Sequence, residues 1–110
     1  MLRKRLIGVI TVNNNIAVQS FGYSNYLPIG RPEVIAKNLD NWGVDEIILQ
    51  SIDSSGNEAG PNYKLLKNVS TLGLSTPLIY SGGIRNVEDA VLVIKSGADR
   101  ICLESILYTD

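Results

Sequence analysis

Three segments of the chain repeat one pattern of polar and apolar positions. The segments GVDEIILQS, GLSTPLIYS and GADRICLES begin at Gly43, Gly73 and Gly97, and each ends on a serine eight residues later. The glycine is typical of a helix C-terminus, and the apolar block after it is typical of a strand buried on both faces. We therefore predict three strands of a parallel sheet, each ending at its serine.

Helix-type spacing fills the intervals between these segments. Residues 31–43, 61–73 and 86–97 carry apolar side chains at helical spacing. Pro32 suits the first helical position of the first helix, and Asn86 suits the N-cap of the last. We interpret the apolar stripes as core rather than as partner grooves. The stripe residues are Val34, Ile35, Leu39 and Trp42, then Leu65, Leu66, Val69 and Leu72, then Val87, Ala90, Val91 and Ile94.

The opening segment predicts one more strand and a hairpin. An apolar run from Leu6 to Val12 reaches three asparagines, and IAVQS follows as a short return strand. Asparagine tolerates the left-handed backbone angles that a tight hairpin needs.

Alternating strands and helices with short connections predict right-handed βαβ units. Either a small doubly wound sheet or a piece of a (βα)8 barrel fits this order, and the repeat favours the barrel because equal units produce equal strand ends. We expect residues 1–110 to form one α/β domain, a (βα)4 half of a TIM-type barrel. It would have a parallel four-stranded sheet, a β-hairpin after strand 1 and a fourth helix that is truncated or absent. Its open edges and apolar inner face predict self-association.

Composition narrows the function classes. The 10 basic and 11 acidic side chains nearly cancel, which argues against nucleic acid as a partner. The chain has no histidine and one cysteine, Cys102, in an apolar run typical of a buried strand. We therefore expect no metal site and no cofactor. The N-terminal apolar run is short and lacks a cleavage-type site, so we expect a cytoplasmic protein without a membrane partner.

Three stretches resemble the cyclase subunit of imidazole glycerol phosphate synthase, a histidine-biosynthesis (βα)8 barrel whose two halves are alike. They are MLRKRLIGVITVNNNIAVQ, EIILQSIDSSGNEAGPNYKLLKNV and PLIYSGGIRNVEDAVLVIKSGADRICLES. The resemblance covers essentially the whole chain but only half of the family's fold.

The resemblance also implies that this chain lacks a catalytic residue of the family. The family's catalytic aspartate at the end of the first strand falls on Thr11, and a family lysine falls on Gln19. A threonine hydroxyl cannot act as a carboxylate acid or base near neutral pH. The family is of lyase type, but we expect no cyclase activity from this chain alone.

The phosphate-binding positions of the family fall on Gly56, Gly82, Gly83 and Ser105. There, backbone amides and a helix dipole would hold the anion, and glycine would let it approach closely. The alternative is that SGGI only turns a strand into a helix. Glu104 stands where the family has a small or neutral residue, and it would repel phosphate if it pointed into the site.

Four further charged residues remain. The sequence leaves two roles possible for two of them and predicts a structural role for the other two. Asp53 stands at a strand end, where this fold places its chemistry, although an aspartate also caps turns. Arg85 either neutralises a phosphate or lies on a solvated helix face. Asp45 and Asp99 occupy matching repeat positions and are expected to be structural.

These observations favour a half-barrel that binds phosphate-bearing small molecules and forms a homodimer or higher homo-oligomer. Two copies about a twofold axis would close eight strands and present two equal phosphate sites. A second interpretation makes the chain half or subunit of a cyclase- or lyase-type enzyme of histidine or surface-polysaccharide biosynthesis that needs a partner. A third is a structural fold fragment without a ligand.

Overall fold

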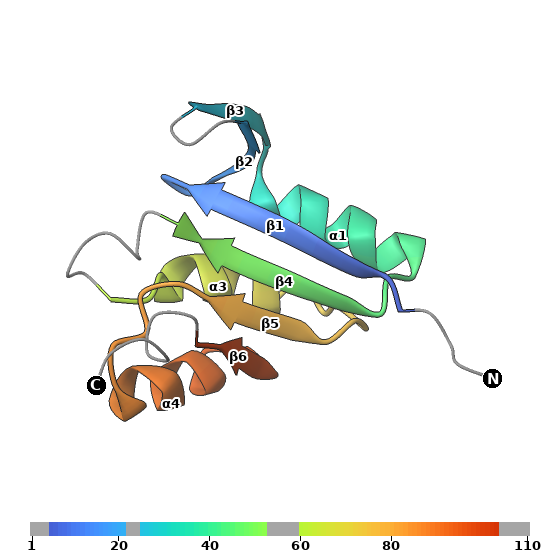
Figure 1. Ribbon diagram of the computed structural model, residues 1–110. Helices are drawn as coiled ribbons and strands as arrows, with labels where there is room; N and C mark the ends of the chain where they lie inside the picture. Colours follow the sequence, from blue (N-terminus) through green and yellow to red (C-terminus); the bar gives the residue numbers. More distant parts are fainter. Residues whose placement is uncertain (1–4, 22–24, 53–59, 104–110) are drawn as a thin grey trace.

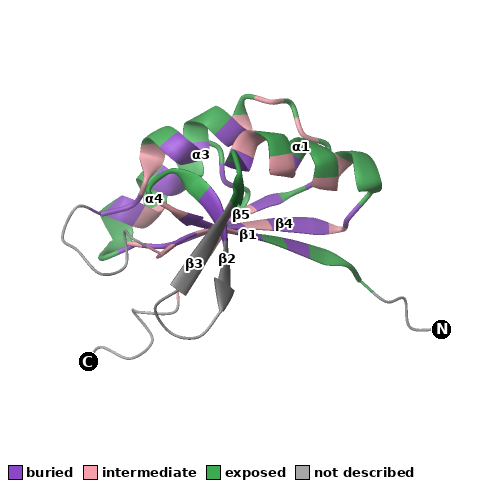
Figure 2. Cartoon of the chain, turned by 90° about the horizontal axis from the view of Figure 1, so that it is seen from above, coloured by how far each residue is buried: buried purple, intermediate pink, exposed green. Residues whose placement is uncertain are grey.

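The computed structural model describes residues 5–21, 25–52 and 60–103 (Figure 1). Its elements follow in the order β1 (Ile7–Asn13), β2 (Ile16–Phe21), β3 (Asn25–Gly30), α1 (Pro32–Trp42), β4 (Glu46–Ser51), α3 (Tyr63–Ser70), β5 (Leu78–Ser81), α4 (Val87–Lys95) and β6 (Arg100–Cys102). The strands form one sheet in the order β3-β2-β1-β4-β5-β6. The helices lie on one side of it (Figure 2). None of these helices is long and apolar enough to cross a membrane.

The α/β class and a mostly parallel sheet are confirmed, but the expected strand count is wrong. The strands β1, β4, β5 and β6 are parallel, whereas β2 and β3 are antiparallel to their neighbours. The sheet of the described residues is therefore mixed and has six strands. The pattern predicts no strand over Asn25–Gly30, which pairs with β2. Its Pro28 is compatible with this place because β3 is an edge strand, where a missing N–H costs little.

The turn between β1 and β2 consists of two asparagines in the left-handed backbone region. Asn14 has φ 54° and Asn15 has φ 63°. Around them Val12 pairs with Ala17, and Asn13 pairs with Ile16. Asparagine is one of the few residues other than glycine that adopts these angles at low cost.

The core lies between the sheet and the helices. The largest fully buried side chain is Tyr80 of β5, and the strands β1 and β4 contribute Ile10 and Leu49 beside it. The helices cover these side chains with Ala36, Leu65, Leu66, Val69 and Val93. The predicted stripe of α3 is confirmed as core, since Leu65, Leu66 and Val69 are buried.

The predicted core stripes of α1 and α4 are only partly correct. On α1, Ile35 and Leu39 pack against the core, but Val34 and Trp42 are exposed. On α4, three of the four stripe residues are exposed and line an open apolar hollow of about 310 Å³: Val87, Val91 and Ile94. Helix α4 lies beside the edge strand β6, and no described element covers this side of it (Figure 1).

The other face of the sheet carries no helix within the described ranges (Figure 2). Ile7 and Val9 of β1 are 46% and 56% exposed on this face. At its amino-terminal end Glu46 is nearly buried and binds both Arg5 and Arg100, the latter at 3.0 Å. An apolar strand face is thus left open, and the ion pairs of Glu46 lie at its amino-terminal end.

Candidate functional site

The stretch SGGI joins the carboxyl end of β5 to α4, and Gly82 lies directly against β4. Gly82 is buried with φ 130°, and a Cβ atom there would lie 2.3 Å from the carbonyl oxygen of Ser51. Any other residue would have to displace the end of β4, so this position requires glycine.

Helix α4 begins close behind this turn. Gly83 has φ 74°, Ile84 is buried, and Asn86 caps the helix by accepting a 2.8 Å hydrogen bond from the amide of Asp89. The predicted N-cap at Asn86 is confirmed. The turn therefore leads from a buried strand end to a capped helix within five residues.

Arg85, which precedes α4, is bound by a carboxylate of that helix. Its Nε and its backbone amide both donate to Oδ2 of Asp89, at 2.9 and 3.0 Å. The hydroxyl of Tyr63 donates to Oδ1 of Asp89 at 3.3 Å. The hydrogen bond from Arg85 holds the pKa of Asp89 below its usual value, whereas burial and the Asp89 charge raise the pKa of Tyr63. Arg85 thus forms an ion pair with Asp89, and its side chain is half exposed.

Asn62, the N-cap residue of α3, links the start of this helix to β5 and to the turn between β1 and β2. Its backbone amide donates to the hydroxyl of the buried Tyr80 at 2.8 Å, and its side-chain Nδ2 donates to Oδ1 of Asn15 at 2.8 Å. Its Oδ1 accepts from the amide of Leu65 at 3.1 Å. Sequence reasoning missed this link; its only signal was a tyrosine inside an otherwise aliphatic strand.

Thr11 lies in β1, half-buried and paired in register with Gln50 of β4. Gln19, at the family's lysine position, lies in β2. The described ranges contain no group of three or more histidine, cysteine, aspartate or glutamate side chains that could hold a metal ion.

The predicted phosphate site is described only in part. Gly82 and Gly83 lie together at the carboxyl end of β5. Gly56 and Ser105, and also Asp53 and Glu104, lie outside the described residues.

Asp45 and Asp99 have the structural role that was predicted for them. Each precedes a strand and accepts a hydrogen bond from the backbone of the neighbouring strand segment. Asp45 accepts from the amide of Leu6 at 2.7 Å, and Asp99 accepts from that of Leu78 at 2.8 Å. Both bonds lie at the amino-terminal end of the sheet, opposite the glycine turn.

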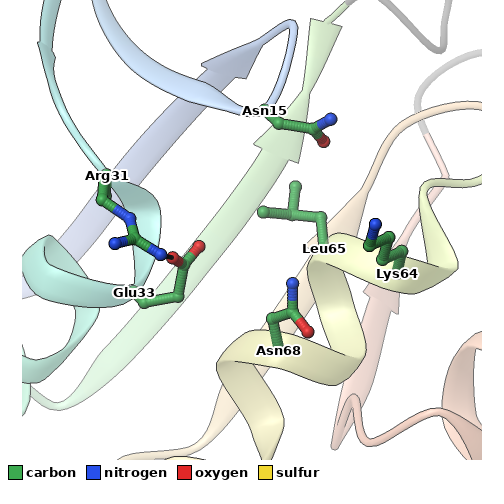
Figure 3. A pocket seen from close by; sticks show the side chains of 6 residues that line it. All are labelled: Asn15, Arg31, Glu33, Lys64, Leu65 and Asn68. Carbon is green, nitrogen blue, oxygen red and sulfur yellow. Dashed lines mark ion pairs between the residues drawn. The ribbon is translucent and has the colours of Figure 1, made fainter.

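A second, polar hollow of about 220 Å³ lies between the starts of α1 and α3 (Figure 3). Arg31 and Glu33 form a 3.2 Å ion pair on one side of it, and Lys64 and Asn68 of α3 line the other. Leu65 lies between them (Figure 3). No motif in the sequence singled out this hollow, because its residues come from segments that only the fold brings together.

Comparisons with known proteins identify the family. The family model described as "Histidine biosynthesis protein" matches residues 28–110. A protein of Vibrio vulnificus, provisionally named an imidazole glycerol phosphate synthase subunit, is 37% identical over 110 residues, which are all of this chain and 40% of that protein. Imidazole glycerol phosphate synthase subunits of Buchnera aphidicola (from Schizaphis graminum) and Thermococcus gammatolerans are 31% and 30% identical. They align with 100% and 96% of this chain.

The chain spans only about two fifths of these relatives, which are covered to 40%, 42% and 41%. The family match nevertheless extends over most of the chain, and the similarity to the synthase subunits covers its whole length. The chain belongs to the histidine biosynthesis protein family.

Proposed function

We propose that the chain binds phosphate-bearing small molecules at the carboxyl end of β5, around Gly82 and Gly83. One observation carries the proposal: two consecutive glycines at positive φ, the first pressed against the Ser51 carbonyl, lead straight into the start of α4. Within the described residues, the amides of Gly83 and Ile84 donate to no acceptor. Free amides beside a helix N-terminus attract anions.

The charge around this turn is compatible with an anion. Asp89 would repel phosphate from the first turn of α4, but its carboxylate is bound by Arg85. By the family resemblance, Gly56 and Ser105 would complete the site.

Thermal unfolding in inorganic phosphate tests this proposal. Phosphate at 100 times its dissociation constant should add about 2.7 kcal/mol to the free energy of unfolding. Gly83→Ala should lose this gain, because a Cβ at φ 74° strains the turn where the anion binds.

Gly43→Ala is the matched control. Gly43 has a similar φ of 79° but ends α1 with open space around it. The Gly43→Ala variant should therefore be less stable than the wild type but keep the gain in unfolding free energy that phosphate gives. The proposal fails if phosphate leaves the wild-type transition unchanged, or if Gly83→Ala retains the full gain.

We further propose that residues 1–110 act as one half-barrel unit that self-associates through its uncovered surfaces. The exposed Ile7 and Val9 on the open sheet face support this, as does the exposed stripe on α4. We expect no cyclase activity from the chain alone, because Thr11 offers no carboxylate at the strand end.

A second candidate is half of a two-chain enzyme in which another polypeptide supplies the remaining strands. The observation that favours it is the coverage of only 40% of the Vibrio vulnificus relative. It predicts a chain that stays monomeric until such a partner is added, whereas the first candidate predicts association with itself.

A further inference from the structure

The polar hollow between the starts of α1 and α3 carries charges of both signs on opposite sides (Figure 3). Glu33 lies with Arg31 on one side, and Lys64 lies with Asn68 on the other. The buried side chain of Leu65 lies between them. The hollow therefore presents a carboxylate and an ammonium group across an apolar floor.

Both of these charged groups keep unused hydrogen-bonding capacity. The side chain of Glu33 is only 22% exposed, and its Oε2 pairs with the far more exposed Arg31. Within the described residues, Oε1 of Glu33 and the ammonium group of Lys64 have no partner. A carboxylate accepts through both of its oxygens, and an ammonium group has three protons to donate. Each group can therefore bind a ligand atom of the opposite charge.

The two signs of charge select the kind of ligand. A ligand with only negative charge would be attracted by Lys64 but repelled by Glu33, and a ligand with only positive charge would meet the reverse. A zwitterion is attracted at both ends. The volume of about 220 Å³ is smaller than the roughly 300–1,000 Å³ of pockets that hold drug-sized ligands, so the hollow suits a small molecule.

We infer that this hollow binds a small zwitterionic amino acid, with its ammonium group on Glu33 and its carboxylate on Lys64. The side-chain amide of Asn68 lies on the same side as Lys64 and can donate to the carboxylate as well. The carbon atoms of the ligand would lie over Leu65. The hollow shares no residue with the glycine turn of the proposed phosphate site.

The hollow also borders both ends of the segment that contains β2 and β3. Asn15 directly precedes β2, and Arg31 directly follows β3. Asn15 is already linked to the start of α3 through Asn62. A bound amino acid would add a second link between this segment and α3, so we expect its binding to change the backbone amide signals of Asn15, Arg31 and Lys64 together.

Titrations of the isotope-labelled chain, followed by heteronuclear NMR, test this inference with three matched ligands. Alanine carries both charges, propionate lacks the ammonium group, and ethylamine lacks the carboxylate. Alanine should bind about two- to fivefold more tightly than either of the others, which is the gain expected from one partly exposed ion pair.

Two variants assign the two ends of the ligand. Glu33→Gln should remove the preference for alanine over propionate and keep the preference over ethylamine, whereas Lys64→Met should do the reverse. Neither side chain belongs to the buried core, so both variants should fold. Lys67→Met is the matched control, because Lys67 is an exposed lysine of the same helix outside the hollow, and it should keep both preferences.

The outcomes are independent of the proposed phosphate site, because inorganic phosphate should bind these variants as it binds the wild type. Equal affinity of the wild-type chain for alanine and for either single-charge ligand would overturn the inference. Signal changes that leave Asn15, Arg31 and Lys64 unaffected would overturn it as well, as would a preference for alanine that survives both Glu33→Gln and Lys64→Met.

Discussion

Individual side chains hold the carboxyl end of the sheet in one arrangement. Tyr80 and Asn62 join β5 to the start of α3, while Arg85 and Asp89 close the start of α4. The hydroxyl of Tyr63 reaches the same carboxylate from α3. Two helix starts are thereby fixed beside the glycine turn by polar contacts.

Removing the Tyr80 hydroxyl should destabilise the fold. Tyr80→Phe leaves the amide of Asn62 without its acceptor in a part-buried setting, so we expect a loss of about 1 kcal/mol in urea unfolding. Tyr63→Phe removes a longer bond of 3.3 Å and should cost less. Equal losses for the two variants would contradict this assignment.

Arg85 should support phosphate binding indirectly. Arg85→Met exposes the Asp89 carboxylate near the start of α4, and we expect phosphate affinity to fall about two- to fivefold, as for a charge beside a helix terminus. Adding Asp89→Asn removes the repelling charge and should restore most of the affinity in calorimetry. A double variant no better than Arg85→Met would show that Arg85 binds the phosphate itself.

Among the helices and strands, Asp40 links the last turn of α1 to the segment before β5. Its Oδ1 accepts from the amides of Ser75 and Thr76 and from the Thr76 hydroxyl, at 3.1, 3.0 and 2.6 Å. The Thr76 hydroxyl is the main cause that lowers the pKa of Asp40 below its ordinary value of 3.8. The contact orients α1 on the sheet.

The lowered pKa predicts an acid-sensitive contribution to stability. A carboxyl group whose pKa is lower in the folded state stabilises that state fully above the unfolded-state pKa, and this is lost as the pH falls through the folded-state pKa. Asp40→Asn should therefore destabilise the chain at pH 7 and flatten the fall in stability below pH 4, measured by urea unfolding. An unchanged pH dependence would exclude this contribution.

The apolar stripe of α4 should act in association rather than in the core. Val91 is 45% exposed, so Val91→Glu should fold normally but shift the chain toward monomer in light scattering. Thr71→Glu adds the same charge at an exposed position at the end of α3 and should leave the oligomer intact. If both variants behave alike, the α4 stripe is not an interface.

The elements differ in how well the sequence predicts them. Periodicity identified the helix faces, but it cannot tell whether a neighbour covers a face, which is why Val91 and Trp42 are exposed instead of buried. The strand β3 was not predicted, and its place at the sheet edge is compatible with Pro28. Gly82 and Gly83 were recognisable as a motif. The link between Asn62 and Tyr80 was not, because it joins segments that only the fold brings together.

At the scale of the whole molecule, the described sheet is covered on one face and open on the other. Helices α1, α3 and α4 pack on one side, while Ile7 and Val9 remain exposed on the other (Figure 2). A closed barrel of about 250 residues would cover such a face, and this chain has 110. We expect association of two copies to bury the open face.

The mass in solution tests this account most directly. Multi-angle light scattering at micromolar concentration should give about 24 kDa or a higher multiple, since closed homo-oligomers are most often twofold dimers and one chain is 12.0 kDa. Exposure to phosphate should not be needed for association. A mass of 12.0 kDa across the micromolar range would contradict the self-associating half-barrel.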